Sequence, residues 1–385
     1  MKRIKKYSSV IIALFIGVLI SGATLRLGNN LSLVSYVYDI LSIQYVDKSV
    51  ENDTLIHGAI KGMLAALDDP YTRFMSPKNY SEMKIRLSGE FSGIGIQIGL
   101  RDNQLTVISP IYNTPAYKAG LKSQDKILKI DDTETTDMGL TDAVSLIRGK
   151  KGSAVILKIL GRNETDPRDV SITRDTIRIN AIEKQAVFDK TGYIKYSTFE
   201  SKQGADELKT AIQDMQASGI KNLILDLRDN GGGLLDGAVQ LTSFFVPEGA
   251  VVHTVDRNKT RETLYVSGDA FYDDPLVILI NSGSASSSEI VAGALRDNGR
   301  ATLIGEPSFG KASVQNVLPL RDGSAVLYTI AKYLTPNGDN IHEVGIPPDV
   351  QIDLSPEALK IYYDPDAYTY ESDAQLQAAL AYFTN

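Results

Sequence analysis

The segment NSGSASSSEIVAGAL, residues 281–295, places a run of serines where an apolar strand passes through a Gly/Ser turn into a helix. Free backbone N–H groups and the positive end of the helix dipole stabilise a negatively charged oxygen at such a helix N-terminus. Acyl transfer to a serine requires that stabilisation, so a serine of this segment is a candidate nucleophile. The spacing Ser286-x-x-Glu289 is also that of a helix capping box, which needs no chemistry.

A lysine in SFGKASVQ, residues 308–315, is a candidate base. An amine in apolar surroundings loses its proton more easily, so Lys311 could activate a serine, although a solvated surface lysine is the commoner case. Residues 305–311 also match Walker A spacing, but Ala312 replaces the magnesium-binding Ser or Thr and poor helix formers follow. Gln315 contacts Lys311 if this segment forms a helical turn; in an extended strand the two lie about 13 Å apart.

Three consecutive glycines follow the apolar strand LILDL in DLRDNGGGLLDG, residues 226–237. Only glycine lets backbone N–H groups come this close to a reacting carbonyl, so Gly231 to Gly233 are candidates for half of an oxyanion hole. A tight strand-to-helix turn is the simpler alternative. The three aspartates of this segment, Asp226, Asp229 and Asp236, match no EF-hand spacing, which favours structural roles over a cation site.

Composition excludes several other chemistries. The 385 residues include no cysteine, so a cysteine nucleophile, disulfides and thiolate metal sites are excluded. His57, His253 and His342 form no HExxH pair and lie outside the glycine-rich segments, so neither a metal site nor a Ser/His/Asp triad is expected. With 40 basic and 47 acidic residues the net charge is −7, which argues against a nucleic-acid partner.

The N-terminus has the layout of an export signal. Four basic residues between positions 2 and 6 precede an apolar run at residues 10–20, and small residues follow at 21–24. The run is short for a full membrane span, so a cleaved signal peptide and a membrane anchor both stay open. The positive flank predicts that everything after about residue 28 lies outside the cytoplasm.

The rest of the chain must supply the elements that position these residues. Apolar residues at helical spacing over 31–67, broken near 46–53, predict two or more short helices. Glycines and short alternating strands over 89–175 predict a small β-rich domain. Beyond residue 186 strands alternate with helices, which predicts βαβ units and a buried, largely parallel sheet, and residues 355–385 end in a helix.

Together the motifs resemble those of the C-terminal processing peptidases, also called tail-specific proteases, of the serine/lysine class. The resemblance spans about residues 35–380, with the motifs in family order. It implies an exported serine endopeptidase that needs no cofactor and acts on proteins with unstructured C-terminal tails. The segments that carry it are GAIKGMLAALDDPYT, FSGIGIQI, SPIYNTPAYKAGLKSQDKILKID, LIRGKKG, LILDLRDNGGG, GSASSSEIVAGAL, FGKASVQ and YLTPNGDNIHEVGIPPD.

The resemblance also assigns catalytic roles to positions of this chain. Ser286 matches the family's nucleophile, Lys311 its general base, and Gln315 the residue that orients the lysine. The oxyanion donors implied in this way are the backbone N–H groups of Gly232 and Ser287.

Residues 89–175 resemble the PDZ module of that family. The loop FSGIG precedes a strand, and its backbone N–H groups form an anion nest that suits the C-terminal carboxylate of a peptide. The edge of the following strand can then pair with the extended peptide. Arg148 of LIRGKKG is a candidate relay between the PDZ domain and the active site. The residues of the carboxylate-binding loop are Gly93, Ile94, Gly95 and Ile96.

The implied fold is multidomain α+β, with a PDZ domain inserted beside a crotonase/ClpP-like α/β serine protease core. The family is often dimeric, so we expect a homodimer joined through the helical segments, either secreted or anchored to the cell membrane by its N-terminus. The expected domains are 1–28 (signal peptide or membrane anchor), 29–88 (N-terminal helical segment), 89–175 (PDZ domain), 176–350 (protease core) and 351–385 (C-terminal helical tail).

Two departures from the family pattern leave alternatives open. Ala312 replaces the usual glycine after the lysine, which could tilt the lysine side chain. Ser287 replaces a usual alanine, so Ser284, Ser287 and Ser288 are rival nucleophiles. The alternative functions are a catalytically inert PDZ scaffold that binds C-terminal peptides and a crotonase-like acyl-thioester enzyme, which shares the architecture of the core.

Overall fold

The computed structural model describes residues 32–46, 51–87, 90–101, 104–111, 114–161, 164–178, 180–364 and 366–384. Its contacts divide the chain into two compact units, the first comprising Met1–Lys78 with Gln315–Thr329 and the second Asn79–Val314 with Ile330–Asn385. The predicted signal peptide or anchor, residues 1–28, lies outside the described residues. Among the helices that are described, none has the length and apolar character of a bilayer span.

The first unit is a helical arm with part of a β-hairpin. The short strand of the arm pairs antiparallel with Ala325–Leu327 of the hairpin. On the same unit, His57 Nε2 lies 2.8 Å from Asp322 Oδ2, which joins the arm to the hairpin turn. The elements are a helix over residues 32–44, α2 (Asn52–Ala65), β1 (Arg73–Met75), and the portions within this unit of β17 (Ser313–Pro319) and β18 (Ala325–Leu334).

A small β-rich domain occupies residues 90–178. Its larger sheet has the order β3-β4-β5-β7-β8 with β6 beside β5, and β2 pairs with β9 in a separate ribbon. Leu105, Val107 and Leu157 from the strands pack against Ala143 and Ile147 in its apolar core. α3 (Pro77–Leu87) precedes this domain. The elements of the domain are β2 (Glu90–Gly93), β3 (Ile96–Arg101), β4 (Gln104–Pro110), α4 (Pro115–Lys118), β5 (Lys126–Ile130), β6 (Thr133–Glu134), α5 (Leu140–Ile147), β7 (Ala154–Leu160), β8 (Arg168–Thr173) and β9 (Asp175–Arg178).

A six-stranded sheet of order β10-β11-β12-β15-β16-β19 carries the catalytic candidates. β10 is antiparallel to β11, and every later neighbour is parallel. Because parallel strands end at one edge, the segments that follow β12, β15 and β16 meet there. The elements are β10 (Ile182–Phe188), β11 (Thr191–Tyr196), α6 (Gly204–Ala217), β12 (Asn222–Asp226), α7 (Leu235–Ser243), β15 (Leu276–Ile280), α8 (Ser287–Asp297), β16 (Thr302–Gly305) and β19 (Val350–Gln351).

Two further strands and two helices complete this unit. β13 pairs with β14 and, through His253 to Asp256, with the end of β18. The side chain of His253 contacts the Thr263 hydroxyl at 2.7 Å and the Pro336 carbonyl at 3.0 Å, a structural role. The elements are β13 (Ala250–Asp256), β14 (Arg261–Tyr265), α9 (Pro356–Tyr362) and α10 (Ala374–Tyr382).

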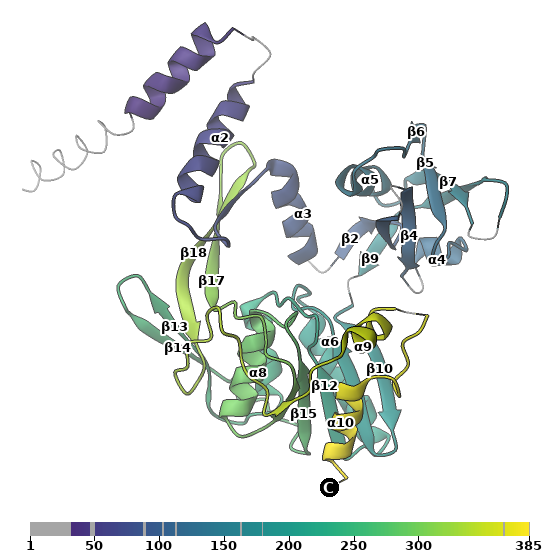
Figure 1. Ribbon diagram of the computed structural model, residues 1–385, viewed down its shortest axis with the longest axis vertical. Helices are drawn as coiled ribbons and strands as arrows, with labels where there is room; N and C mark the ends of the chain where they lie inside the picture. The colour runs from purple at the N-terminus through teal and green to yellow at the C-terminus, as the bar shows by residue number, and fades with distance from the viewer. Residues whose placement is uncertain are drawn as a thin grey trace, which may run out of the picture. The chain divides into compact units, whose positions relative to one another are not determined.

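Helices cover both faces of the six-stranded sheet, because successive strand residues point to opposite faces. Leu225 and Ile278 pack in the cluster that contains α6, α7 and α8, whereas Ile224 and Val277 pack with Leu376 of α10. Figure 1 shows β12 and β15 between α8 and α10. A strand buried on both faces explains why LILDL is almost entirely apolar.

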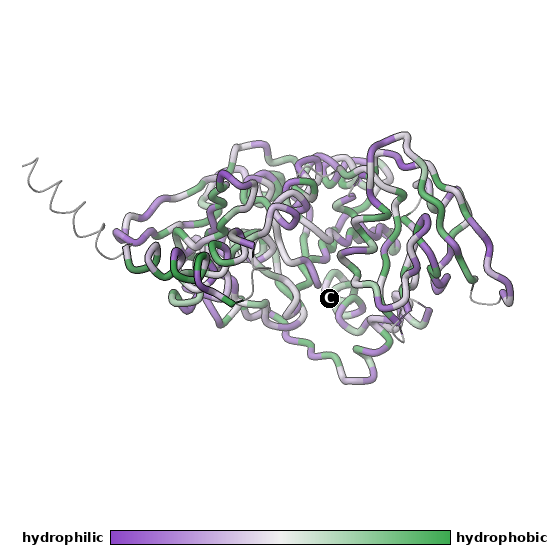
Figure 2. The backbone as a smooth tube through the Cα atoms, turned by 90° about the horizontal axis from the view of Figure 1, so that it is seen from above, coloured by the Kyte–Doolittle hydropathy of each residue, from purple (hydrophilic) through white to green (hydrophobic). Residues whose placement is uncertain are grey.

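The structure confirms the predicted fold class and most of the predicted elements. The strand predicted at Lys126–Ile130 is β5, and the helix break near residues 46–53 separates the helix over 32–44 from α2. Figure 2 shows green apolar stretches between purple polar stretches along the chain, as expected when strands and helices bury one face and expose the other. The C-terminal tail also packs on the core sheet, since Leu376 and Ala379 of α10 are fully buried against it.

Candidate active site

Ser286 lies at the N-cap of α8, immediately after the turn that follows β15. Its backbone has φ +55° and ψ −115°, a conformation that non-glycine residues rarely adopt. Strain of this kind is typical of a serine held on a sharp strand-to-helix turn with its hydroxyl exposed. Ser286 is half-buried, and its N–H donates to Glu289 Oε2 at 2.8 Å, so this part of the predicted capping box is present.

The three rival serines are buried and their hydroxyl protons are already used. Ser284 Oγ donates to Leu227 O at 2.8 Å, and Ser288 Oγ donates to Asn230 O at 2.8 Å. Ser287 Oγ donates to Gly233 O at 3.0 Å, which links the serine turn to the glycine loop. Each rival hydroxyl therefore stabilises backbone of the glycine loop or of the strand end before it.

The glycine loop reaches the serine turn at Gly232. A Cβ atom added there would lie 2.8 Å from Ser286 Cβ and 2.8 Å from Ser287 N, and φ is +92°. Only glycine fits this approach. The N–H of Gly232 donates to Asn230 Oδ1 at 2.9 Å, so an oxyanion bound here must share or replace that acceptor. The structure thus brings together Ser286 and both predicted oxyanion residues, Gly232 and Ser287.

A buried ion cluster supports the base of the glycine loop. Arg228, 1% exposed, contacts Asp226 Oδ2 at 2.6 Å and Asp373 Oδ2 at 2.7 Å. Burial disfavours the ionised form of Asp226, but the adjacent guanidinium outweighs it and holds the pKa of that carboxyl below its usual value. Asp226 therefore has a structural role, and a C-terminal residue helps to hold the loop.

The loop that carries Lys311 lies against the same helix N-terminus. Lys311 N donates to Glu289 Oε2 at 3.0 Å, and Tyr333 OH donates to Lys311 O at 2.6 Å. Ala312 is fully buried in the apolar core without a left-handed backbone, so its methyl group is accommodated. The following residues form β17 rather than a helix, which removes the structural context of a phosphate loop.

Gln315 lies in β17, within the first unit, whereas Lys311 belongs to the second. Residues 313–319 are extended, so the helical turn considered for this segment does not form. The Gln315 side-chain amide donates to Tyr71 O at 2.5 Å. The catalytic role of Gln315 stays a prediction.

The predicted carboxylate-binding loop of the PDZ domain is fixed through its carbonyl groups. Gly95 O accepts from Ile111 N at 2.9 Å and from Thr114 Oγ1 at 3.0 Å, and Ile94 O accepts from Ala116 N at 2.8 Å. Gly95 has φ +78°, and an added Cβ would lie 2.4 Å from Thr114 Cβ. A glycine is therefore required at the centre of this loop.

A small groove of about 70 Å³ adjoins that loop. Val144 and Ile147 of α5 line it together with Gly93, Ile94, Gly95 and Ile96. The guanidinium carbon of Arg148 lies 4.8 Å from the centre of the Phe91 ring, a cation–π distance, and Arg148 lines the same groove. The structure therefore places Arg148 beside the carboxylate-binding residues.

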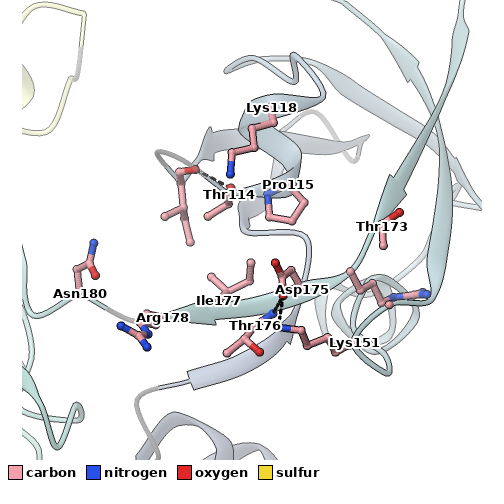
Figure 3. A pocket seen from close by; sticks show the side chains of 13 residues that line it. Thr114, Pro115, Lys118, Lys151, Thr173, Asp175, Thr176, Ile177, Arg178 and Asn180 are labelled. Atoms are coloured by element: carbon pink, nitrogen blue, oxygen red, sulfur yellow. Dashed lines mark hydrogen bonds and ion pairs between the residues drawn. The ribbon is translucent and has the colours of Figure 1, made fainter.

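A larger hollow of about 640 Å³ lies elsewhere on the PDZ domain, between α4 and β9 (Figure 3). Lys118, Lys151 and Arg174 give its lining a positive character. Lys151 pairs with Asp175 at 2.6 Å, and the Arg174 guanidinium donates to three backbone carbonyls. Two of these three charges are therefore used within the domain, and we assign this hollow no catalytic or binding role.

Sequence reasoning missed two sets of residues at the site. The sequence predicts Glu289 only as a helix cap, yet its carboxylate also accepts from the backbone of the Lys311 loop. Tyr362 and Tyr363 of the C-terminal segment donate to Asp229 at 2.8 Å and 2.9 Å. Burial and the bond to Asp229 raise the pKa of Tyr363 to about 12. In the sequence these residues stand out only as two adjacent tyrosines, and that pattern does not indicate a contact with Asp229.

Comparison with known families matches three models to this chain. Peptidase family S41 covers residues 190–352, a PDZ domain covers residues 106–161, and the N-terminal domain of the activating protease CtpB covers residues 21–79.

Curated relatives match most of the chain. The carboxyl-terminal-processing protease of Synechocystis sp. is 38% identical over 351 residues, which are 90% of this chain and 81% of that protein. The carboxy-terminal processing protease CtpA of Bacillus subtilis is 38% identical over 336 residues, which are 87% of this chain and 71% of that protein. Both names describe proteases, so nothing here favours the inert PDZ scaffold or the acyl-thioester enzyme.

Solved structures of similar fold include a photosystem II D1 C-terminal processing protease. It is 30% identical with a TM-score of 0.51, and the match covers 87% of this chain and 97% of that one. A putative S41 protease from Bacteroides fragilis has a TM-score of 0.57 at 17% identity, covering 91% of this chain and 97% of that one. The second match supports the fold alone.

Proposed function

The chain belongs to peptidase family S41, as a carboxyl-terminal processing serine protease with a PDZ domain, and from this premise we propose that Ser286 is its nucleophile and Lys311 its general base. The observation that carries the proposal is how the serines of residues 284–288 differ in exposure, backbone conformation and hydrogen bonding. Ser286 alone of residues 284–288 combines partial exposure with a strained backbone at a helix N-terminus, while its three serine neighbours donate to backbone carbonyls.

The proposed reaction proceeds through an acyl-enzyme. Unprotonated Lys311 Nζ takes the Ser286 hydroxyl proton while Oγ attacks the scissile carbonyl carbon. The tetrahedral intermediate collapses, the C–N bond breaks, and the lysine returns the proton to the leaving amine. Water, deprotonated by Lys311, then attacks the ester and releases the new C-terminal carboxylate together with free Ser286. No cofactor takes part.

The oxyanion of both tetrahedral intermediates is proposed to bind the N–H groups of Gly232 and Ser287. Proximity of Gly232 to Ser286 and Ser287 supports this, as does the dipole of α8, whose positive end points at the same place. Gly232 N–H presently donates to Asn230 Oδ1. An oxyanion carries more charge than an amide oxygen and competes well for this donor.

Gln315 is proposed to orient Lys311, as the family resemblance implies. The contact with Tyr71 O fixes the side-chain amide of Gln315 within the first unit.

The PDZ domain is proposed to recognise the C-termini of protein substrates with unstructured tails. Anchored carbonyls of Ile94 and Gly95 support a loop whose N–H groups bind the terminal carboxylate. The apolar groove beside α5 suits the last side chain, and the strand edge of β3 can pair with the tail. Arg148 lines this groove, and we propose that it relays the binding of a peptide in the groove to the active site.

The domain boundaries, location and assembly are proposed as follows. Residues 1–28 export the chain as a cleaved signal or an anchor, 29–88 form the helical arm, 89–175 the PDZ domain, 176–350 the protease core and 351–385 the helical tail. The protein then acts outside the cytoplasm, secreted or attached to the cell membrane.

A homodimer is proposed through the helical segments. Exposed apolar side chains on the arm support it, among them Leu33, Tyr36 and Ile43, which are 65%, 63% and 81% exposed. Light scattering after gel filtration tests this proposal. Twice the mass of one chain is expected, whereas the mass of a single chain contradicts it.

Incubation with a protein that has a disordered C-terminal tail tests the catalytic proposal, with intact mass as the readout. Wild type shortens the tail, and Ser286→Ala and Lys311→Ala leave it intact while keeping wild-type thermal unfolding. Ser282→Ala is the matched control, because that serine is exposed in the same turn, and it should remain active. Full activity of either Ser286→Ala or Lys311→Ala would refute the dyad.

A further inference from the structure

Glu289 is a buried carboxylate at the third position of α8. Its side chain is 1% exposed, although an ionised carboxylate is costly to bury unless its oxygens are well bonded. A capping box would use it for one bond only, from Ser286 N–H. Its three other short hydrogen bonds come from a segment 19 to 22 residues further along the chain, and Tyr333 OH lies 3.3 Å from Oε2.

The two carboxylate oxygens of Glu289 divide the donors between them. Oε2 accepts from Ser286 N at 2.8 Å and from Lys311 N at 3.0 Å, so these two backbone nitrogens lie no more than 5.8 Å apart. Oε1 accepts from Gly310 N at 2.7 Å and from Ser308 Oγ at 2.6 Å. Each oxygen thus accepts two of these four short hydrogen bonds.

Ser308 and Tyr333 complete the connection. The Ser308 hydroxyl accepts from Ile346 N at 2.7 Å, which leaves its proton for Glu289. Tyr333 OH gives its single proton to Lys311 O at 2.6 Å and lies 3.2 Å from Ser286 O. The backbones of the proposed nucleophile and base are therefore joined through one buried carboxylate and one phenol.

We propose that Glu289 is a positioning residue that sets the distance between the backbones of Ser286 and Lys311. This inference rests on the proposed dyad. Both side chains start from backbone that Glu289 holds, so its loss changes the approach of Lys311 Nζ to Ser286 Oγ without touching the PDZ groove. Misplacement of reacting groups by about 1 Å costs about 10²-fold in rate.

Glu289→Gln tests this proposal. The amide replaces one oxygen by an NH₂ group, which faces two donors and breaks one pair of bonds. We expect kcat on a disordered tail to fall about 100-fold, KM to stay within about 3-fold, and the labelling rate of Ser286 by a serine-reactive probe to fall in parallel with kcat. Glu207→Gln is the matched control, because Glu207 accepts one backbone N–H, from Ala181 at 2.9 Å, and should keep wild-type kcat.

Ser308→Ala keeps the proposal testable if Glu289→Gln does not fold. It removes one of the four donors, so kcat should fall about 3- to 10-fold with KM unchanged. Wild-type kcat in a folded Glu289→Gln, or in Ser308→Ala when only that variant folds, overturns the positioning role. Ser286→Ala is assayed in parallel: activity there refutes the dyad itself, whereas an inactive Ser286→Ala beside a fully active Glu289→Gln refutes only the role of Glu289.

Discussion

Two glycine loops of this protein are proposed to receive a negatively charged oxygen, and different forces hold them. The PDZ loop around Gly95 is fixed by hydrogen bonds from backbone N–H groups and from one threonine, Thr114. The catalytic loop around Gly232 is fixed by side-chain amides and by a buried ion cluster. Asn230 Nδ2 donates to Tyr196 O at 2.7 Å, and Arg228 pairs with Asp226 below it.

The difference matches the precision that each task needs. A PDZ loop must only retain a carboxylate, and a small displacement costs some binding energy. An oxyanion hole must fit a short-lived geometry, and small displacements there cost rate directly. Buried side-chain networks give one well-defined arrangement when every group is satisfied. We therefore expect changes that displace the catalytic loop to act on kcat or on folding, and changes that displace the PDZ loop to act on KM.

The largest effect is expected from Gly232→Ala. The added methyl would overlap Ala285 O at 2.6 Å and Ser287 N at 2.8 Å, so the loop must move away from the nucleophile. Loss of one oxyanion donor lowers kcat about 10²- to 10³-fold. Gly231→Ala is the control, since nothing lies within 4 Å of its added Cβ, and it should keep kcat within about 2-fold. Equal effects of the two variants would contradict the placement of Gly232 at the reacting oxygen.

Arg228→Met should strongly destabilise the protease core. It leaves Asp226 and Asp373 buried without their cation, and breaking a buried pair in this way costs about 3–5 kcal/mol. Chemical unfolding followed by tyrosine fluorescence measures the loss. Arg168→Met is the control from the PDZ domain, where a 40% exposed arginine contacts Glu164 at 3.3 Å, and it should cost less than about 1 kcal/mol. Similar losses in both variants would remove the distinction drawn between the two loops.

Gly95→Ala should weaken recognition and leave chemistry unchanged. The new Cβ would clash with Thr114 and requires a left-handed alanine, so we expect KM for a tail substrate to rise about 10- to 100-fold at constant kcat. Gly120→Ala separates clash from backbone strain, because Gly120 has the same φ of +78° with nothing within 4 Å of an added Cβ. A fall in kcat for Gly95→Ala at unchanged KM would contradict the expectation.

The smallest effect expected is a pH dependence of core stability. The pKa of Asp226 is lower in the folded protein than its usual value, so the folded state binds this proton less readily than the unfolded state. The stabilisation is complete above the unfolded pKa and is lost as pH falls through the folded pKa. The difference in unfolding free energy between wild type and Asp226→Asn should be constant near neutral pH and shrink in acid. A difference that grows in acid would reverse the sign.

Much of the fold follows from local sequence patterns. The apolar strand LILDL and the alternation of strands with helices beyond residue 186 predict a parallel sheet, which the order of β11, β12, β15 and β16 confirms. Parallel strands end at one edge, and that rule brings the serine, glycine and lysine segments together. Ser286, Gly232 and Ser287 meet in the structure for this reason.

The supporting residues could not be predicted, because their partners are distant in sequence. β16 lies between Glu289 and its partners Gly310 and Lys311 in the sequence, so their contact depends on the place of β16 in the sheet. Arg228 contacts Asp373, which is 145 residues away in the sequence. Whether Gln315 can contact Lys311 depends on whether residues 313–319 are helical or extended. The poor helix formers of this segment favour the extended state, but its pairing with β18 has no local signal.

The central claim is that Ser286 attacks the substrate, and covalent labelling tests it most directly. Wild-type protein is treated with a fluorophosphonate, digested, and the modified residue is located by tandem mass spectrometry. The account predicts one adduct on Ser286, absent from Ser286→Ala and formed much more slowly in Lys311→Ala. An adduct on Ser284, Ser287 or Ser288, or labelling of Lys311→Ala at the wild-type rate, would contradict it.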